Sequence, residues 1–139
     1  MLEIRPIGII HSNIKDTKKA PKYFLESDEE GIIEILSEFK DGLFRIEERT
    51  HIVVLFHFHK SEGEPQMHQS TRKDSDPKGV FSTCSPKRPN SIGMSVVQLL
   101  KVDGNKLYVK GIDMLDGTPV LDIKPYKEFR IKENVSAVF

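Results

Sequence analysis

The longest stretch of consecutive apolar residues in this chain is only five residues long, Ile52 to Phe56, and most of it is β-branched. A membrane-crossing helix needs about 20 such residues, so we expect no membrane-spanning segment. The run lies inside a nine-residue segment, His51 to His59, whose composition is typical of a strand in the middle of a sheet. The starting expectation is therefore a fold built from short strands.

Further short apolar runs follow along the chain, separated by turn residues. They predict strands over residues 5–11, 32–36, 79–83, 94–102, 106–112 and 120–124. Asp103 and Gly104 predict a tight turn between two of these strands, and residues 38–45 have apolar spacing that suits a short helix. We expect a mainly β protein, a small closed or partly closed β-barrel with one or two short helices, because closure removes exposed sheet edges.

The length of the chain, 139 residues, predicts a single domain over residues 1–139. A polar loop at about residues 60–78 interrupts the apolar pattern. Loops of this length inside a compact domain are commonly functional lids or disordered segments. No two glycines lie two positions apart, so the glycine fingerprint of a dinucleotide-binding Rossmann fold is absent.

The charges of the chain are balanced, with 21 basic and 21 acidic side chains. A histone-like mode of nucleic-acid binding is therefore not expected, although a local basic patch is compatible with these totals. The only cysteine, Cys84, cannot form an intrachain disulfide. Together with a start that lacks a signal-peptide pattern, this predicts an intracellular protein.

Two histidines, His57 and His59, occupy alternate positions of the predicted central strand and therefore share a face. With His51 or His68 they could supply three nitrogen ligands to zinc or non-haem iron. The alternative is that these rings only fill one face of the strand. Because no carboxylate or cysteine ligand lies beside them, we favour the second interpretation and predict no metal site.

Two other segments have unusual composition. Residues 85–93 hold two prolines that stiffen the backbone around Lys87 and Arg88, which favours either recognition of an anion or a plain turn with solvated cations. Cys84, just before this segment, lacks the helix start or cation cluster that would favour a reactive thiolate. We therefore expect it not to act as a nucleophile.

Residues 113–126 gather three aspartates, a threonine, a lysine and a tyrosine between turn residues. Asp122 and Lys124 alternate on the last predicted strand and share a face. They could bind a ribose diol or an ammonium group, or form only an ion pair with each other. The density of polar groups in this segment favours a site.

Four motifs occur in order along the chain: Arg5-Pro6-Ile7 followed by residues 8–12, Arg88-Pro89-Asn90 followed by residues 92–95, Asp116 to Pro119, and Asp122 to Tyr126. In this arrangement the chain resembles the TrmO-type tRNA methyltransferases, a β-barrel family that uses S-adenosylmethionine. The resemblance covers nearly the whole chain and is weakest in the polar loop.

This resemblance implies a cytoplasmic homodimer of small barrels that binds S-adenosylmethionine without a Rossmann fold. It also implies methylation of the exocyclic nitrogen of threonylcarbamoyl-adenosine beside the tRNA anticodon. An alternative of another class is a non-catalytic module that binds S-adenosylmethionine and regulates a partner.

The resemblance also implies the residues of the site. The cofactor-binding positions would be Pro21, Lys22, Tyr23, His59, Lys60, Cys84, Arg88, Asn90, Asp116, Gly117, Thr118 and Pro119. The family usually has arginine at the position of Cys84 and proline at that of Ser91. Asp122 or Tyr126 would serve as a general base, and the sequence does not choose between them. Cations expected to contact tRNA are Lys60, Arg72, Lys73, Lys78, Lys87 and Arg88.

Overall fold

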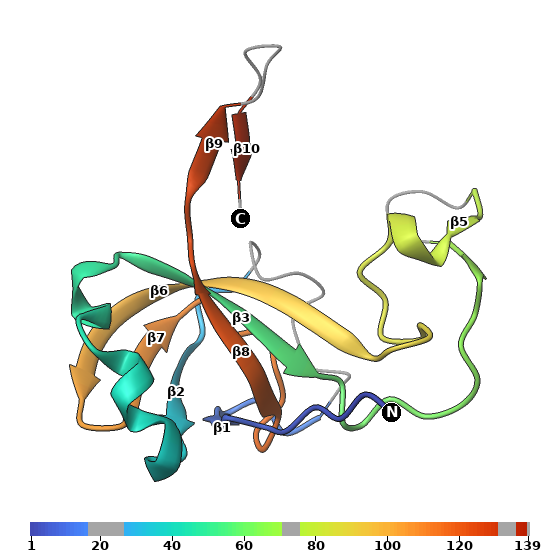
Figure 1. Ribbon diagram of the computed structural model, residues 1–139. Coiled ribbons are helices and arrows are strands. Elements are labelled where there is room, and N and C mark those ends of the chain that lie inside the picture. Colours follow the sequence, from blue (N-terminus) through green and yellow to red (C-terminus); the bar gives the residue numbers. More distant parts are fainter. Residues whose placement is uncertain (17–26, 71–75, 131–135, 139) are drawn as a thin grey trace.

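Six antiparallel strands close into a barrel in a computed structural model of the chain, which describes residues 1–16, 27–70, 76–130 and 136–138 (Figure 1). The order around the barrel is β1-β2-β7-β6-β3-β8. The strands are β1 (Gly8–His11), β2 (Glu30–Ile35), β3 (His51–His57), β6 (Ile92–Asp103), β7 (Lys106–Lys110) and β8 (Pro119–Pro125). The predicted mainly β barrel is thus confirmed.

The alternation of side chains along each strand fills the barrel interior. On β3, Ile52, Val54 and Phe56 belong to the core, and Val54 pairs with Ser95 of β6 and Ile123 of β8. Fully buried isoleucine, leucine and valine side chains from the other strands complete this interior. Each such side chain stabilises the fold by about 1.5–3 kcal/mol relative to its exposed state, so the period-two pattern determines which face of each strand turns inward.

The short helix predicted over residues 38–45 is present and is of the 3-10 type. The chain there forms two 3-10 segments, η3 (Ser37–Leu43) and η4 (Ile46–Glu48), and no described residue lies in an α-helix. Neither segment contains a fully buried residue, and Arg45 between them has a positive φ of 64°. A longer helix would lack a buried apolar face to stabilise it.

The predicted strand over residues 79–83 is largely wrong. Only β5 (Lys78–Gly79) is extended there, and η5 (Val80–Ser82) follows at once. Val80 is buried, whereas Phe81 is 79% exposed. Only one side chain of this short apolar run is therefore buried, too few to hold a strand against a sheet. β5 pairs with β4 (His68–Gln69), which lies in the polar loop expected at about residues 60–78.

Residues 60–91 lie in the connection from β3 to β6 and are here called the insertion; its described parts, residues 60–70 and 76–91, form an excursion beside the barrel (Figure 1). It is held by its own hydrogen bonds: the Gln66 amide donates to the Lys87 carbonyl, and the Gln69 side chain donates to the same carbonyl. The Val80 amide donates to the carbonyl of Met67. These contacts explain how a segment with few apolar residues keeps a defined path.

A second hairpin, β9 (Glu128–Arg130) with β10 (Ser136–Val138), was not predicted and projects from the end of β8 (Figure 1). None of the helical segments in the described ranges is long and apolar enough to cross a bilayer.

Gly93 at the start of β6 leaves room for two aromatic rings at one end of the barrel. A Cβ at this position would lie 2.4 Å from Cζ of Phe56 and 2.8 Å from Cζ of Phe58. Those rings pack edge to face, with centroids 5.1 Å apart. The aromatic pair therefore depends on a residue without a side chain at position 93.

Replacing Gly93 with alanine should lower the free energy of unfolding by about 1–3 kcal/mol, because buried rings must move to admit the methyl group. Gly79→Ala is the matched control, since its Cβ would enter open space and its φ of −62° suits alanine. Urea denaturation measures both changes. Equal stability of the two variants would contradict the packing described for Gly93.

Candidate functional site

A cavity of about 430 Å³ opens between the end of β3, the insertion and the turn over residues 113–118, and we call it the insertion pocket. Its volume lies within the roughly 300–1,000 Å³ typical of small-molecule sites. The side chains that line it are Phe56, His57, Phe58, His59, Lys60, Ser61, Thr83, Cys84, Pro86, Arg88, Ile92, Met94, Asp113, Met114, Leu115 and Thr118, and Gly93 completes the wall. Aromatic, aliphatic and thioether groups thus enclose a few charged ones.

Five of the residues expected at the site meet in this pocket: His59, Lys60, Cys84, Arg88 and Thr118. They come from three segments that lie far apart in the sequence. The barrel places the end of β3 beside the start of β6, and the insertion between these strands returns to the same edge. The pocket is therefore a consequence of the strand order.

The stiff loop predicted around Arg88 has a hydrogen-bonded basis. Nη1 of Arg88 donates to the carbonyls of Thr83 and Ser85, at 2.8 and 3.2 Å. The guanidinium is half-buried and lines the pocket while it holds this loop. Cys84 is exposed beside it.

The turn at residues 113–118 is fixed to the first strand by Asp116. Its carboxylate accepts from the Ser12 amide at 3.0 Å and from Nζ of Lys15 at 2.8 Å. The hydrogen bond from Lys15, and then that from Ser12, hold the pKa of Asp116 below its usual range. Gly117 has a φ of 85°, which favours glycine at that position. Both residues shape the turn, while Thr118 faces the pocket.

His59 joins this turn to the end of β3. Its Nδ1 lies 3.4 Å from Oγ1 of Thr118. Burial lowers the pKa of His59, and the nearby charges of Lys60 and His57 lower it further. The imidazole is therefore neutral near pH 7, so it can act as a hydrogen-bond acceptor or donor in the pocket.

Sequence reasoning did not single out Asp113, although it counted this residue within a dense acidic segment. Asp113 lines the pocket, and burial raises the pKa of its carboxyl group to about 6. Oγ of Ser95, a fully buried residue of β6, donates to its Oδ1 at 2.6 Å. The sequence also did not predict that Phe56 and Phe58 line a cavity, because apolar periodicity does not reveal a neighbouring cavity.

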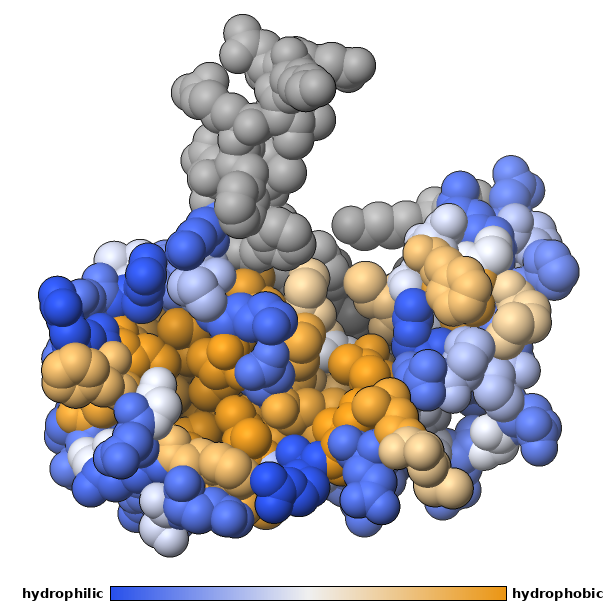
Figure 2. Space-filling model, in the orientation of Figure 1, coloured by the Kyte–Doolittle hydropathy of each residue, from blue (hydrophilic) through white to orange (hydrophobic). Residues whose placement is uncertain are grey.

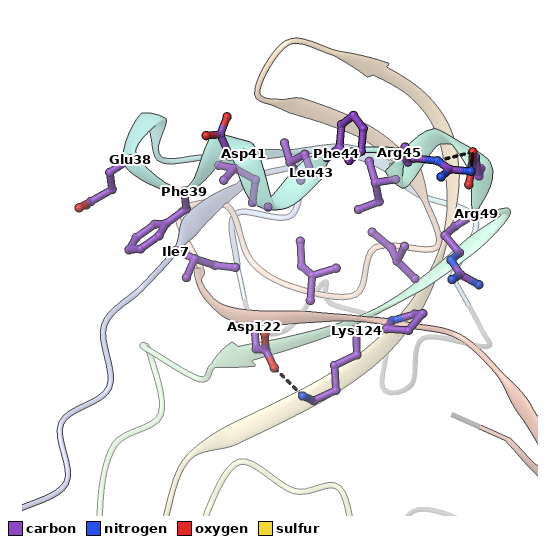
Figure 3. A pocket seen from close by; sticks show the side chains of 17 residues that line it. Ile7, Glu38, Phe39, Asp41, Leu43, Phe44, Arg45, Arg49, Asp122 and Lys124 are labelled. Atoms are coloured by element: carbon purple, nitrogen blue, oxygen red, sulfur yellow. Dashed lines mark hydrogen bonds and ion pairs between the residues drawn. The ribbon is translucent and has the colours of Figure 1, made fainter.

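Asp122 lies outside the insertion pocket. It forms an ion pair with Lys124 at 2.8 Å, and both line a groove of about 830 Å³ on the side of the barrel next to η3 (Figure 3). Leu55 of β3 pairs with Asp122 on one side and with Met94, a pocket residue, on the other. Two strand spacings separate Asp122 from Met94, roughly 10 Å between Cα atoms.

The remaining expected site residues occupy separate places. Tyr126 follows β8 and contacts His51, with ring centroids 5.8 Å apart. Asn90 is exposed, and Pro119 pairs with Ile9 in the barrel wall. Pro21, Lys22 and Tyr23 lie outside the described residues, as do Arg72 and Lys73.

The surface in Figure 2 shows hydrophobic residues gathered over the barrel beside η3 and η4, with hydrophilic residues around them. The groove there is walled by apolar side chains such as Ile7, Phe39 and Leu43. By contrast, the two titratable groups whose pKa is shifted chiefly by burial, the Asp113 carboxyl and the His59 imidazole, both line the insertion pocket. The insertion pocket is therefore the better candidate for chemistry.

We find no set of metal ligands in the described part of the chain. Those residues contain no group of three or more His, Cys, Asp or Glu side chains placed to hold a metal ion. His57 and His59 both border the insertion pocket. The pocket as built suits an organic ligand with an apolar or aromatic part and charged ends.

Comparisons with known proteins agree with this architecture. Residues 9–130 match the family model of the tRNA-methyltransferase O N-terminal domain. The chain is 46% identical over 142 aligned positions to a "Probable S-adenosyl-L-methionine-binding protein" of Pyrococcus abyssi, covering 97% of this chain and 74% of that protein. It is 44% identical over 105 positions to a human "tRNA (adenine(37)-N6)-methyltransferase", covering 73% of this chain but 24% of that protein.

Among solved structures, TrmO from Pseudomonas aeruginosa superposes with a TM-score of 0.75 at 35% identity, covering 91% of this chain and 56% of that one. The chain thus spans about half of that bacterial protein and about a quarter of the human one. The matched family model extends over nearly all of the barrel strands and over both segments that border the pocket. The chain belongs to the TrmO family, as a tRNA-methyltransferase O N-terminal domain.

Proposed function

We propose that this chain binds S-adenosylmethionine in the insertion pocket and methylates the exocyclic nitrogen of threonylcarbamoyl-adenosine beside a tRNA anticodon. The observation that carries the proposal is the meeting of His59, Lys60, Arg88 and Thr118, positions implied by the family resemblance, around one cavity of suitable size. Relatives named as S-adenosyl-L-methionine-binding proteins and as tRNA (adenine(37)-N6)-methyltransferases support it.

The chemistry of the pocket fits this cofactor. The aromatic pair Phe56–Phe58 and Met114 offer apolar surface to an adenine ring, and Lys60 at the exposed rim offers a cation to the carboxylate of the methionine part. When bound, the cofactor supplies an electrophilic methyl group on a sulfonium. The chain's own residues then have to hold the target nitrogen about 3–3.5 Å from that methyl group, in line with the breaking bond.

The target nitrogen is a weak nucleophile, so removal of its proton by a general base would assist transfer. Asp122 is our candidate for that role, with Tyr126 as the other. Asp122 lies roughly 10 Å from the pocket edge across β3. An extended nucleotide bound over this face could span that distance, and in the proposed homodimer a second subunit could shorten it.

A second function, a regulatory module that binds S-adenosylmethionine without catalysis, is favoured by one observation. Cys84 lines the pocket where the family resemblance implies an arginine, so a guanidinium is missing there. The loss of that charged contact is what favours binding without catalysis. The homodimer and the cytoplasmic location remain part of the proposal, and light scattering of the purified chain measures the first.

Calorimetric titration of the protein with S-adenosylmethionine should give a micromolar dissociation constant, roughly −8 kcal/mol. Labelled methyl groups should then pass to tRNA that carries threonylcarbamoyl-adenosine and not to the same tRNA without it. Binding without transfer to either tRNA would favour the regulatory module. Absence of binding, with and without tRNA, would exclude both functions.

Replacing Asp122 with asparagine should lower the turnover of bound tRNA by about 10²–10⁴-fold, because the proposed base is lost. The affinity for S-adenosylmethionine should not change, since this side chain lies outside the pocket. Lys124→Gln is the matched control: it breaks the same ion pair but retains the carboxylate, so turnover should fall far less. Similar turnover in wild type and Asp122→Asn would remove Asp122 from the role of base.

Lys87 should contact the tRNA backbone, since it is an exposed cation of the insertion beside the pocket wall. Lys87→Ala should weaken tRNA binding and reduce the slope of log K against log salt by about 1. Lys106 is an exposed lysine at the start of β7, beside the turn from β6. Lys106→Ala should change neither the tRNA affinity nor the salt slope. Filter binding over a salt series measures both, and equal slopes for all three proteins would contradict a tRNA contact at Lys87.

A further inference from the structure

Asp113 is a charged group that the proposed mechanism does not use, although it lies in the wall of the insertion pocket. It follows β7 by three residues and opens the turn that ends at Thr118. Ser95, on the inward face of β6, is fully buried, and its hydroxyl donates to Oδ1 of Asp113 at 2.6 Å. A buried hydroxyl thus orients the carboxyl group at the pocket wall.

No cation neutralises this carboxylate among the residues that the structure describes. By contrast, Asp116 is paired with Lys15 and Asp122 with Lys124. Burial is the largest influence on Asp113 and raises its pKa; hydrogen bonds from Ser95 and from the backbone of Asp113 itself oppose that effect in part, and no positive charge does. An anion in such a place costs stability unless something compensates it. A ligand cation would provide that compensation.

The surroundings of Asp113 favour an onium ion as this ligand cation. Phe56 and Phe58 line the same cavity, and aromatic faces attract cations that have left water. The positive side chains that line the pocket, Lys60 and Arg88, both belong to the insertion, whereas Asp113 belongs to the turn before β8. Arg88 is already bonded to two backbone carbonyls. The pocket therefore presents its cations and its one carboxylate from different segments, as a zwitterionic ligand requires.

We propose that Asp113 supplies the counter-charge to the sulfonium of S-adenosylmethionine and thereby makes the pocket prefer the charged cofactor over its neutral product, S-adenosylhomocysteine. This inference rests on the proposed function. Transfer of the methyl group would break the S–CH₃ bond and form the N–CH₃ bond, and the proton of the target nitrogen would pass to the general base proposed above. The sulfur would keep the electron pair of the broken bond and lose its positive charge. The attraction to Asp113 then disappears, which favours release of the product.

The test compares the affinities of both compounds by calorimetry at pH 7.5. In Asp113→Asn, binding of S-adenosylmethionine should weaken roughly 10–100-fold, the range expected for a charge-assisted contact. Binding of S-adenosylhomocysteine should stay within about threefold of wild type, because the asparagine is of equal size and can still accept from Ser95. Asp103→Asn, the same change at an exposed turn, should alter neither affinity.

A measurement on the unmutated protein keeps the proposal testable if Asp113→Asn does not fold. Carbon-13 NMR of the Asp113 carboxyl group, titrated around pH 6, should show its pKa fall when S-adenosylmethionine is bound and change little with S-adenosylhomocysteine. His57, His59, Lys60, Cys84 and Arg88 also face this pocket, and Asp116 lies on the same turn. Observing the carboxyl carbon itself separates its titration from theirs.

The outcomes are distinct. Equal weakening of both compounds in Asp113→Asn would place the carboxylate on a group that they share, such as the ammonium, and would overturn the proposal. Unchanged affinities in that variant, with binding intact in wild type, would overturn it as well and leave the proposed function standing. If the wild-type protein binds neither compound, with or without tRNA, the proposed function fails and the inference fails with it.

Discussion

The pairing of β1 with β8, the first and last strands of the barrel, is the constraint on which the candidate site depends. β1 meets β8 through Gly8 with Val120 and Ile9 with Pro119, which closes the barrel. The seam continues beyond the strands: the Ile10 amide donates to the carbonyl of Thr118, and the Gly117 amide donates to that of Ile10. The turn before β8 is thereby held at the barrel end, with Thr118 and Asp113 toward the pocket.

The other wall of the pocket comes from the connection between β3 and β6. These two strands pair along the whole length of β3, so a 34-residue connection must leave the barrel and return to the same edge. Its hydrogen bonds run from side chains and amides to carbonyls within the insertion. A polar segment of this kind can keep its shape without a core of its own, and its charged residues stay available to a ligand.

The barrel strands could be predicted because each carries a short apolar run, and the unbroken run from Ile52 to Phe56 is the strongest of these signals. Along β1 the burial alternates strictly, as a period of two requires. The strand expected over residues 79–83 was not found because the chain turns into a 3-10 segment at Val80, whose side chain is buried without a sheet partner in the described residues. β4 could not be found, since its two residues, His68 and Gln69, carry no apolar pattern. Short strands that are held by hydrogen bonds, and not by buried apolar side chains, cannot be predicted from the hydropathy pattern.

The candidate site was predictable in part, through motifs whose residues the barrel brings together, such as His59 with Thr118. Asp113 could not be separated from Asp116 by sequence, because both sit in one acidic turn. Only the fold shows that Asp116 is bonded to Ser12 and Lys15 at the seam, whereas Asp113 is bonded to a buried serine at the pocket. Burial and partners, which depend on distant segments, distinguish the two carboxylates.

The most direct test of the account is to map S-adenosylmethionine onto the protein by amide NMR shifts. Binding in the insertion pocket predicts that the largest changes fall at His59, at residues 83–88 and at residues 113–118, which line it. Changes concentrated instead at Phe39, Leu43 and Arg45, in the groove beside η3, would contradict the central claim.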